Sequence, residues 1–403
     1  MIQRMVVLAM LMCAALVGSV AQQHSLDSLL RAHSYGLSIS RGSLEGEGLD
    51  LILEAARDAQ FFVIAEEHNV SALNALSGHL FEELHGRFGF NYIALEQGTV
   101  VTSMLGDERR RGDMTAIREL IHTYPHAPTF ATDEELQLVA DVGGRSSAET
   151  NPIWGVDQEF GVLHILERLA ELAPDKAARD KVKELADSAR AYELDRSGDV
   201  HFAAQVLVPD DLSELPTLFH PKAGSEAQIL IEALQRTNRI YHNYWESRRG
   251  KPTAHENGRE REESMKLRFM ELYRQAQEKG EALPRVVAKL GHWHTLRGFS
   301  QANVPTFGNF LSEFSISNGM KTFILSTYVI EGPESWRNNT GVLQRIASPS
   351  QFTVVDFRPL RPHAHQGKIS DLSDAWKRLL FRADAALIIR GGETGSYGIS
   401  RGK

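Results

Sequence analysis

The segment Phe61-Phe62-Val63-Ile64-Ala65-Glu66-Glu67-His68 joins a short apolar run to two carboxylates and an imidazole. The five apolar residues predict a strand buried on both faces, as is typical of a parallel sheet covered by helices. Ligand and catalytic sites of open α/β sheets lie at the carboxyl ends of their strands. The polar triplet therefore marks the first candidate site.

Working outward, the same alternation of strand and helix signals recurs along the chain. Leucines return at helical spacing from Leu73 to Leu84, and such alternation is typical of βαβ units. We therefore predict an α/β fold with a central, mainly parallel sheet flanked by helices. Further strands are predicted at residues 92–95, 152–156, 285–290, 322–325, 352–355 and 386–389.

The middle of the chain lacks strand signals between about residues 161 and 283. Its leucines begin a helical pattern at Leu163, and a second long pattern covers about residues 226–278. We interpret this region as a helical insertion in one α/β domain at 22–403; a separate helical domain is the alternative. The glycine-rich residues after about Gly391 are predicted to be frayed.

The first 21 residues are typical of a signal peptide. Arg4 precedes an apolar run from Met5 to Val17, and small residues lead to a predicted cleavage after Ala21. The mature protein is then expected to be periplasmic or secreted, without stable membrane insertion; an N-terminal membrane anchor is the alternative. Because Cys13 is the one cysteine, the mature chain would have neither a disulfide nor a thiolate nucleophile.

Charge and motif content exclude several classes of function. The net charge of −8 disfavours a nucleic-acid partner. The chain contains no Gly-x-Ser-x-Gly elbow, Walker A loop, Rossmann glycine fingerprint or His-Glu-x-x-His motif. What remains is a mechanism in which histidine and carboxylate side chains activate water.

Two predicted strands end in carboxylates that could act together. On an extended segment, Glu66 and His68 share one side and Glu67 faces the other, so Glu66 and His68 are the predicted working pair. A polar turn in which His68 caps the next helix is the alternative. Glu96 ends the run at 92–95, and a parallel sheet could place it beside this pair; a salt bridge to a helix is the plainer interpretation.

Two later strands end in an acid and in a histidine pair. Asp157 could orient an imidazole or cap the following helix. His292 and His294 could bind a metal or act as base and electrophile, although one of the two is expected to be a packed core histidine. Arg297 follows them and could hold an anionic group of a substrate.

In this order, the motifs resemble those of a superfamily that contains erythromycin esterases, ChaN-like haem-binding uptake proteins and TraB/Tiki proteins. Ala65-Glu66-Glu67-His68 is similar to the first motif with Ala in place of Gly, Glu96 to the second, and Gly291-His292-Trp293-His294 to the third. Gly155-Val156-Asp157-Gln158 looks like a Gly-x-Asp segment of the esterases. Arg261 and Met265 resemble an Arg-Asp-x-x-Met helix in which Glu262 replaces Asp.

The resemblance extends from about residue 61 to residue 311. It implies a site built from His68, Glu96 and His294, with Glu66 in support and Arg261 in contact with substrate. Both histidine motifs are one residue shorter than those of the esterases, and their spacing is nearer to the ChaN-like and Tiki forms.

Together these features predict a secreted hydrolase that acts on an ester, lactone or amide of a small-molecule substrate. His68 would take a proton from water, Glu66 or Glu96 would orient it, and His294 with Arg297 nearby would stabilise the oxyanion. No cofactor is required in this interpretation. A divalent metal on His68, Glu96 and His294, as in a Tiki-like peptidase, is a variant; a ChaN-like protein that binds haem or another iron compound is the alternative, and an inactive relative that only binds partners is a third.

Overall fold

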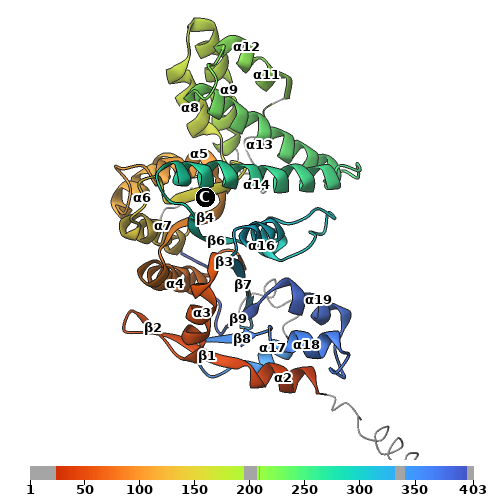
Figure 1. The fold of residues 1–403 in the computed structure, drawn as a ribbon. Helices are drawn as coiled ribbons and strands as arrows, with labels where there is room; N and C mark the ends of the chain where they lie inside the picture. Colours follow the sequence, from red (N-terminus) through yellow and green to blue (C-terminus); the bar gives the residue numbers. More distant parts are fainter. Residues whose placement is uncertain (1–23, 195–206, 208, 332–340, 397–403) are drawn as a thin grey trace, which may run out of the picture.

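The computed structural model describes residues 24–194, 207, 209–331 and 341–396. The predicted signal peptide, including Cys13, lies outside these residues. The described chain builds a nine-stranded sheet in the order β2-β1-β8-β9-β7-β3-β6-β4-β5 (Figure 1). The strands are β1 (Ser34–Ser40), β2 (Ser43–Glu45), β3 (Ala59–Glu66), β4 (Phe90–Gly98), β5 (Ile153–Asp157), β6 (Arg285–Gly291), β7 (Lys321–Val329), β8 (Phe352–Asp356) and β9 (Ala385–Ile389).

Neighbouring strands run parallel from β9 through β7, β3, β6 and β4 to β5, and β8, β1 and β2 continue the sheet in antiparallel fashion. The predicted α/β class and mainly parallel sheet are therefore confirmed. The helices before β6 are α2 (Leu26–Ala32), α3 (Glu47–Arg57), α4 (Ser71–Phe88), α5 (Thr99–Leu105), α6 (Met114–Thr123), α7 (Asp133–Arg145), α8 (Leu163–Leu172), α9 (Lys176–Leu194), α11 (Pro209–Ser213), α12 (Leu215–Phe219), α13 (Glu226–Arg248) and α14 (Ala254–Glu278). Those after it are α15 (His292–Thr295), α16 (Phe307–Ser317), α17 (Gly341–Ile346), α18 (Leu360–His365) and α19 (Asp374–Arg382).

The central strands are apolar throughout because both faces of the sheet are covered. Every residue of β3 is buried. Phe62 and Ile64 belong to the apolar cluster on one face, whereas Phe61 and Val63 belong to the cluster on the other, as the period of two in a strand requires. This two-sided burial explains the continuous apolar runs in the sequence.

Between β5 and β6 the described residues form helices and no strand. Helices α8, α9, α11, α12 and α13 pack around an apolar cluster of their own that includes Leu166 and Leu234. Helix α14 instead places Met265 and Phe269 in a cluster of the sheet, and Figure 1 shows it lying between the sheet and the other helices. In the described part of the chain, no helix is both long and apolar enough to span a bilayer.

Two features differ from the predictions. The β1–β2 hairpin was not predicted. Its first strand lacks an alternating pattern, since β1 is intermediate in burial at six of its seven positions. The turn at Arg41 and Gly42 has positive φ angles of 50° and 81°. The residues after Gly391 are not frayed as far as Ser396. Gly395 N donates to Asn69 O (2.8 Å) and Asp133 N to Ser396 O (2.7 Å), so the backbone of this segment is paired with the loop after β3 and with the start of α7.

Candidate functional site

Three adjacent strands bring the predicted groups together. The order β3-β6-β4 places Gly291, at the end of β6, between Glu66 at the end of β3 and Glu96 near the end of β4. A cavity of about 560 Å³ opens at this edge, a volume suited to a small-molecule ligand. Of the residues proposed from the sequence, it is lined by Glu66, His68, Glu96, Arg261, His292 and His294.

Glu96 is the centre of the arrangement. Its Oε2 accepts a hydrogen bond from the backbone N–H of Gly291 (2.7 Å), and its Oε1 accepts one from Arg261 (2.7 Å). Burial alone would raise the pKa of Glu96, but His294, His68 and Arg261 together lower it to about 2. Glu96 is therefore a fixed negative charge at neutral pH.

Two carboxylate–imidazole pairs face each other across Glu96. His68 Nδ1 is 3.2 Å from Glu66 Oε1, and His294 Nδ1 is 2.8 Å from Glu262 Oε1. The Nε2 atoms of both rings lie 3.7 Å from Glu96, one at each of its oxygens. These distances are too long for direct hydrogen bonds, so both Nε2 atoms remain available to a water molecule or a substrate.

The two imidazoles differ in environment. Burial lowers the pKa of His68, but Glu96 and Glu66 outweigh it and raise the pKa to about 9. The ring also stacks on Phe130, with centroids 4.3 Å apart. At neutral pH His68 is therefore an imidazolium, so in the free protein it could accept a proton only near pH 9 or above.

A buried lysine pairs with carboxylates of this cluster. Lys289 Nζ donates to Glu66 Oε2 (2.5 Å) and Glu135 Oε2 (2.9 Å), and its side chain is only 1% exposed. Burial raises the pKa of Glu66, but Lys289 and His68 reverse the shift and lower it. Lys289 interrupts an otherwise apolar strand, which is the signal that could have identified it in the sequence.

Gly291 permits the close approach of the two motifs. A Cβ atom at this position would lie 2.7 Å from His68 Nε2 and 3.2 Å from Glu96 Oε2. Any larger residue would occupy the space into which both groups point.

His292 and Asp157 have supporting positions. Burial lowers the pKa of His292 to about 4, and its ring packs beside Tyr328 with centroids 5.6 Å apart, so it is the neutral, packed member of the histidine pair. Asp157 binds Arg261 (3.0 Å between Oδ1 and Nε). It does not cap α8, whose N-cap residue is Val162.

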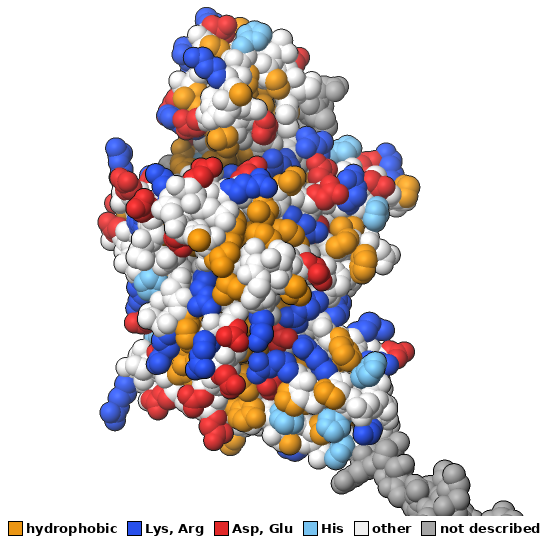
Figure 2. Space-filling model, in the orientation of Figure 1, with side chains coloured by type: hydrophobic (Ala, Val, Ile, Leu, Met, Phe, Trp, Pro, Cys, Tyr) orange, Lys and Arg blue, Asp and Glu red, His pale blue; other side chains and the backbone are white. Residues whose placement is uncertain are grey.

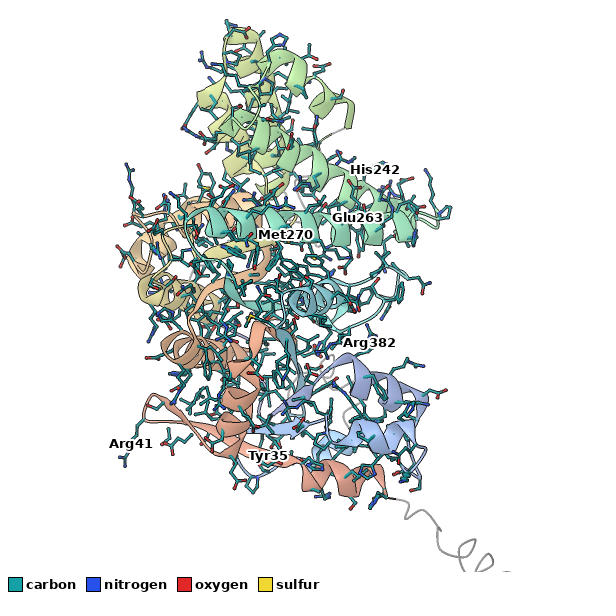
Figure 3. All side chains as sticks on the ribbon, in the orientation of Figure 1. Tyr35, Arg41, His242, Glu263, Met270 and Arg382 are labelled. Carbon is teal, nitrogen blue, oxygen red and sulfur yellow. The ribbon has the colours of Figure 1, made fainter. Side chains whose placement is uncertain are left out.

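Arg297 lies away from the cavity lining. It donates to Asp384 (2.6 Å), to the carbonyl oxygen of Thr322 (2.9 Å) and to Ser312, while Arg382, which Figure 3 labels, donates to the carbonyl oxygen of Arg297.

Sequence reasoning did not include Glu262, Lys289 or Glu135 among the site residues. Glu262 could have been recognised, because it occupies the acid position of the Arg261–Met265 motif.

The residues of the site are not arranged as a metal-binding site. Among the described residues, no group of three or more His, Cys, Asp or Glu side chains is arranged to hold a metal ion. Both oxygens of Glu96 already accept hydrogen bonds. His68, Glu96 and His294 do not form a ligand set in this arrangement, and we derive no step through a metal.

No protein-family model and no curated protein matches the chain. Among solved structures, a mutant of erythromycin esterase EreC in its open conformation superposes with a TM-score of 0.59 at 12% identity, over 91% of this chain and 99% of that one. A succinoglycan biosynthesis protein gives a TM-score of 0.56 at 13% identity, over 94% and 99%. The haem-binding ChaN of Campylobacter jejuni reaches only 0.35 at 10% identity, over 89% and 98%. The chain therefore has the same overall fold as erythromycin esterase EreC.

Proposed function

We propose that the protein is a hydrolase that cleaves an ester, lactone or amide bond of a small molecule with a water molecule activated in this cavity. The observation that carries the proposal is the convergence of two carboxylate-bound imidazoles on one buried carboxylate. In each pair the acid fixes the ring through Nδ1 and leaves Nε2 facing the cavity. This is the arrangement that carboxylate–histidine pairs use in acyl transfer.

The different environments of the two rings suggest different roles. His294, with Nδ1–H donated to Glu262, accepts a proton from water at Nε2, and the hydroxide adds to the carbonyl carbon. His68, as an imidazolium, donates its Nε2–H to the oxyanion that forms. The intermediate then collapses, and His294 returns its proton to the leaving oxygen or nitrogen. This assignment reverses the roles expected from the sequence.

The test compares neighbouring glutamates of α14. Glu262 is buried against His294, whereas Glu263 is 52% exposed on the outer surface of the helix and pairs with Arg259 (Figure 3). With aryl acetates and lactones as substrates, His294→Ala should lower kcat about 10²–10⁴-fold. Glu262→Gln should also lower kcat, because an amide no longer stabilises the imidazolium that forms, while Glu263→Gln should behave as wild type. Equal rates in all three variants would overturn the proposal.

Metal and haem dependence can be measured on the same preparation. Chelation should leave activity unchanged if the chain's own residues suffice, whereas a stoichiometric ion whose removal abolishes activity would support the Tiki-like variant. Titration with haemin tests the ChaN-like alternative, since a Soret band that His68→Ala and His294→Ala both abolish would support haem binding. Secretion and removal of residues 1–21 remain part of the proposal and are checked by N-terminal sequencing of the exported protein.

A further inference from the structure

The walls of the cavity carry more negative than positive charge. The cavity lining and the groups bonded directly to it contain five carboxylates: Glu66, Glu67, Glu96, Asp157 and Glu262. A sixth, Glu135, is bonded to Lys289, which in turn binds Glu66. The permanent cations among the described residues of this cluster are Arg261 and Lys289. Even if Glu135 is uncharged and both His68 and His294 are protonated, the acids still outnumber the cations.

The cations are already committed to carboxylates inside the protein. Arg261 binds Asp157 and Glu96 together, and Lys289 binds Glu66 and Glu135. The third candidate for binding an anion, Arg297, pairs with Asp384 outside the cavity lining. An anionic substrate would therefore meet no uncompensated arginine or lysine in the described part of the cavity.

Among the carboxylates that line the cavity directly, Glu67 is the one that the catalytic arrangement does not use. Its side chain is 30% exposed and lines the cavity. Among the described residues Glu67 has no arginine or lysine partner. His292 Nδ1 lies 3.8 Å from its Oε1, and the charge of His68 also acts on it. Burial raises the pKa of Glu67 while the charge of His68 opposes that shift, and a cationic ligand in the cavity would favour the ionised carboxylate.

An exposed aromatic ring shares the cavity with Glu67. Trp293 lies between the two site histidines in α15, lines the cavity and is 60% exposed. Its neighbour His294 is buried, so the fold turns the indole outward while it holds the imidazole in place. An indole face together with a carboxylate is the combination that binds quaternary and protonated amines.

We propose that Glu67 and Trp293 form a subsite for a cationic amine, so that the enzyme selects amine-bearing substrates over neutral or anionic substrates of the same shape. This inference rests on the proposed function, because an amine bound here is a substrate only if the protein is a hydrolase. The subsite itself concerns binding and can be tested without turnover.

The probes are choline and its uncharged isostere 3,3-dimethylbutan-1-ol, titrated calorimetrically into the mature chain at neutral pH. Choline should bind about tenfold more tightly, which corresponds to about 1.4 kcal/mol. The preference should weaken as salt is added, since Glu67 is partly exposed. Equal affinities in the unmodified protein would overturn the proposal.

Variants then identify the residues responsible. Glu67→Gln should bring the affinity ratio close to one, and Glu67→Asp, which keeps the charge, should retain much of it. Trp293→Ala should weaken choline binding more than alcohol binding. Glu45→Gln is the matched control, because Glu45 is exposed on β2 at the far edge of the sheet, and it should leave the ratio unchanged. A ratio that survives Glu67→Gln would refute the subsite.

The acetate esters of the two probes separate this inference from the proposed function. Hydrolysis of both esters at equal kcat/KM would support the hydrolase and overturn the amine subsite. Retained choline selectivity in binding, without hydrolysis of either ester, would support the subsite and count against the hydrolase.

Discussion

At the scale of single residues, the site uses one buried carboxylate to control two imidazoles. Glu96 is held by Gly291 and Arg261, and its fixed charge attracts a proton to His68. Each ring has a carboxylate at Nδ1 and lies 3.7 Å from Glu96 through Nε2. The same residue type is assigned two roles here because His68 stacks on Phe130 and its pKa is raised to about 9 by Glu96 and Glu66. Environment rather than residue identity decides which imidazole can be the acid.

The pH dependence of hydrolysis follows from the pKa of about 9 at His68. Below that pH the ring is an imidazolium and can stabilise the oxyanion; above it the proton and the positive charge are lost. We therefore expect kcat/KM to fall as pH rises through about 9. The profile of His68→Gln should lack this descending limb. A wild-type rate that instead rises toward pH 9 would show that His68 is the proton acceptor.

At the scale of elements, strand β6 supplies contacts that hold the site residues of its neighbours in place. Its Lys289 reaches Glu66 at the end of β3 and Glu135 of α7, while its last residue binds Glu96 of β4. A charged side chain in the middle of a parallel sheet is costly to bury unless it is paired. The element is therefore organised around the site as well as around the core.

Lys289→Met should destabilise the protein strongly, because it leaves the buried Glu66 and Glu135 without the lysine that pairs with both. We expect the free energy of unfolding in urea to fall by about 3–5 kcal/mol. Lys321→Met removes a lysine that is 73% exposed and paired with Asp58, and should cost less than about 1 kcal/mol. Adding Glu135→Gln to Lys289→Met should recover part of the loss. A single variant as stable as the control would contradict this account.

The C-terminal segment joins the loop that carries His68 to the start of α7. Gly395 donates to Asn69 O, Ser71 donates to Glu393 O, and Ser396 accepts from Asp133 N. A chain ending at Gly391 should keep its fold but position His68 poorly, so kcat should fall while the circular dichroism spectrum is retained. A chain ending at Ser396 is the control and should keep full activity. Equal kcat in the two truncations would show that the segment does not position the site.

At the scale of the whole molecule, the chain contains separate apolar clusters. Two cover the faces of the sheet, and a third lies within α8, α9 and α11–α13. Charged side chains of both signs are interspersed over the face of the molecule in Figure 2. The site lies at the strand ends beneath α14, between the sheet and the helical region.

The separate cluster predicts that the helical region can loosen on its own. Leu166 is completely buried there, and Leu166→Ala should cost about 2–5 kcal/mol locally. Hydrogen exchange should then accelerate in α8 and α13 while β3 remains protected. Leu267→Ala, at a position that is 67% exposed, serves as control. Equal acceleration in β3 would mean that sheet and helices unfold as one unit.

The sequence by itself determined the central sheet and the strand-end groups. Apolar runs such as Phe61–Ala65 can only be buried on both faces, and polar residues directly after them must gather at one edge of a parallel sheet. That reasoning, together with the resemblance of the motifs, singled out Glu66, His68, Glu96 and His294, and all four line one cavity.

Only the tertiary structure decided how those groups are paired. Glu262 and Lys289 come from α14 and the middle of β6, and their partners lie 32 and 223 positions away in the chain. No local pattern encodes such a contact, because a side chain's partner depends on the strand order and on the helix that covers the strand ends. Those long-range contacts protonate His68, pair Arg261 and Arg297 with carboxylates, and leave Glu67 without an arginine or lysine partner among the described residues. They determine the chemistry proposed for the site.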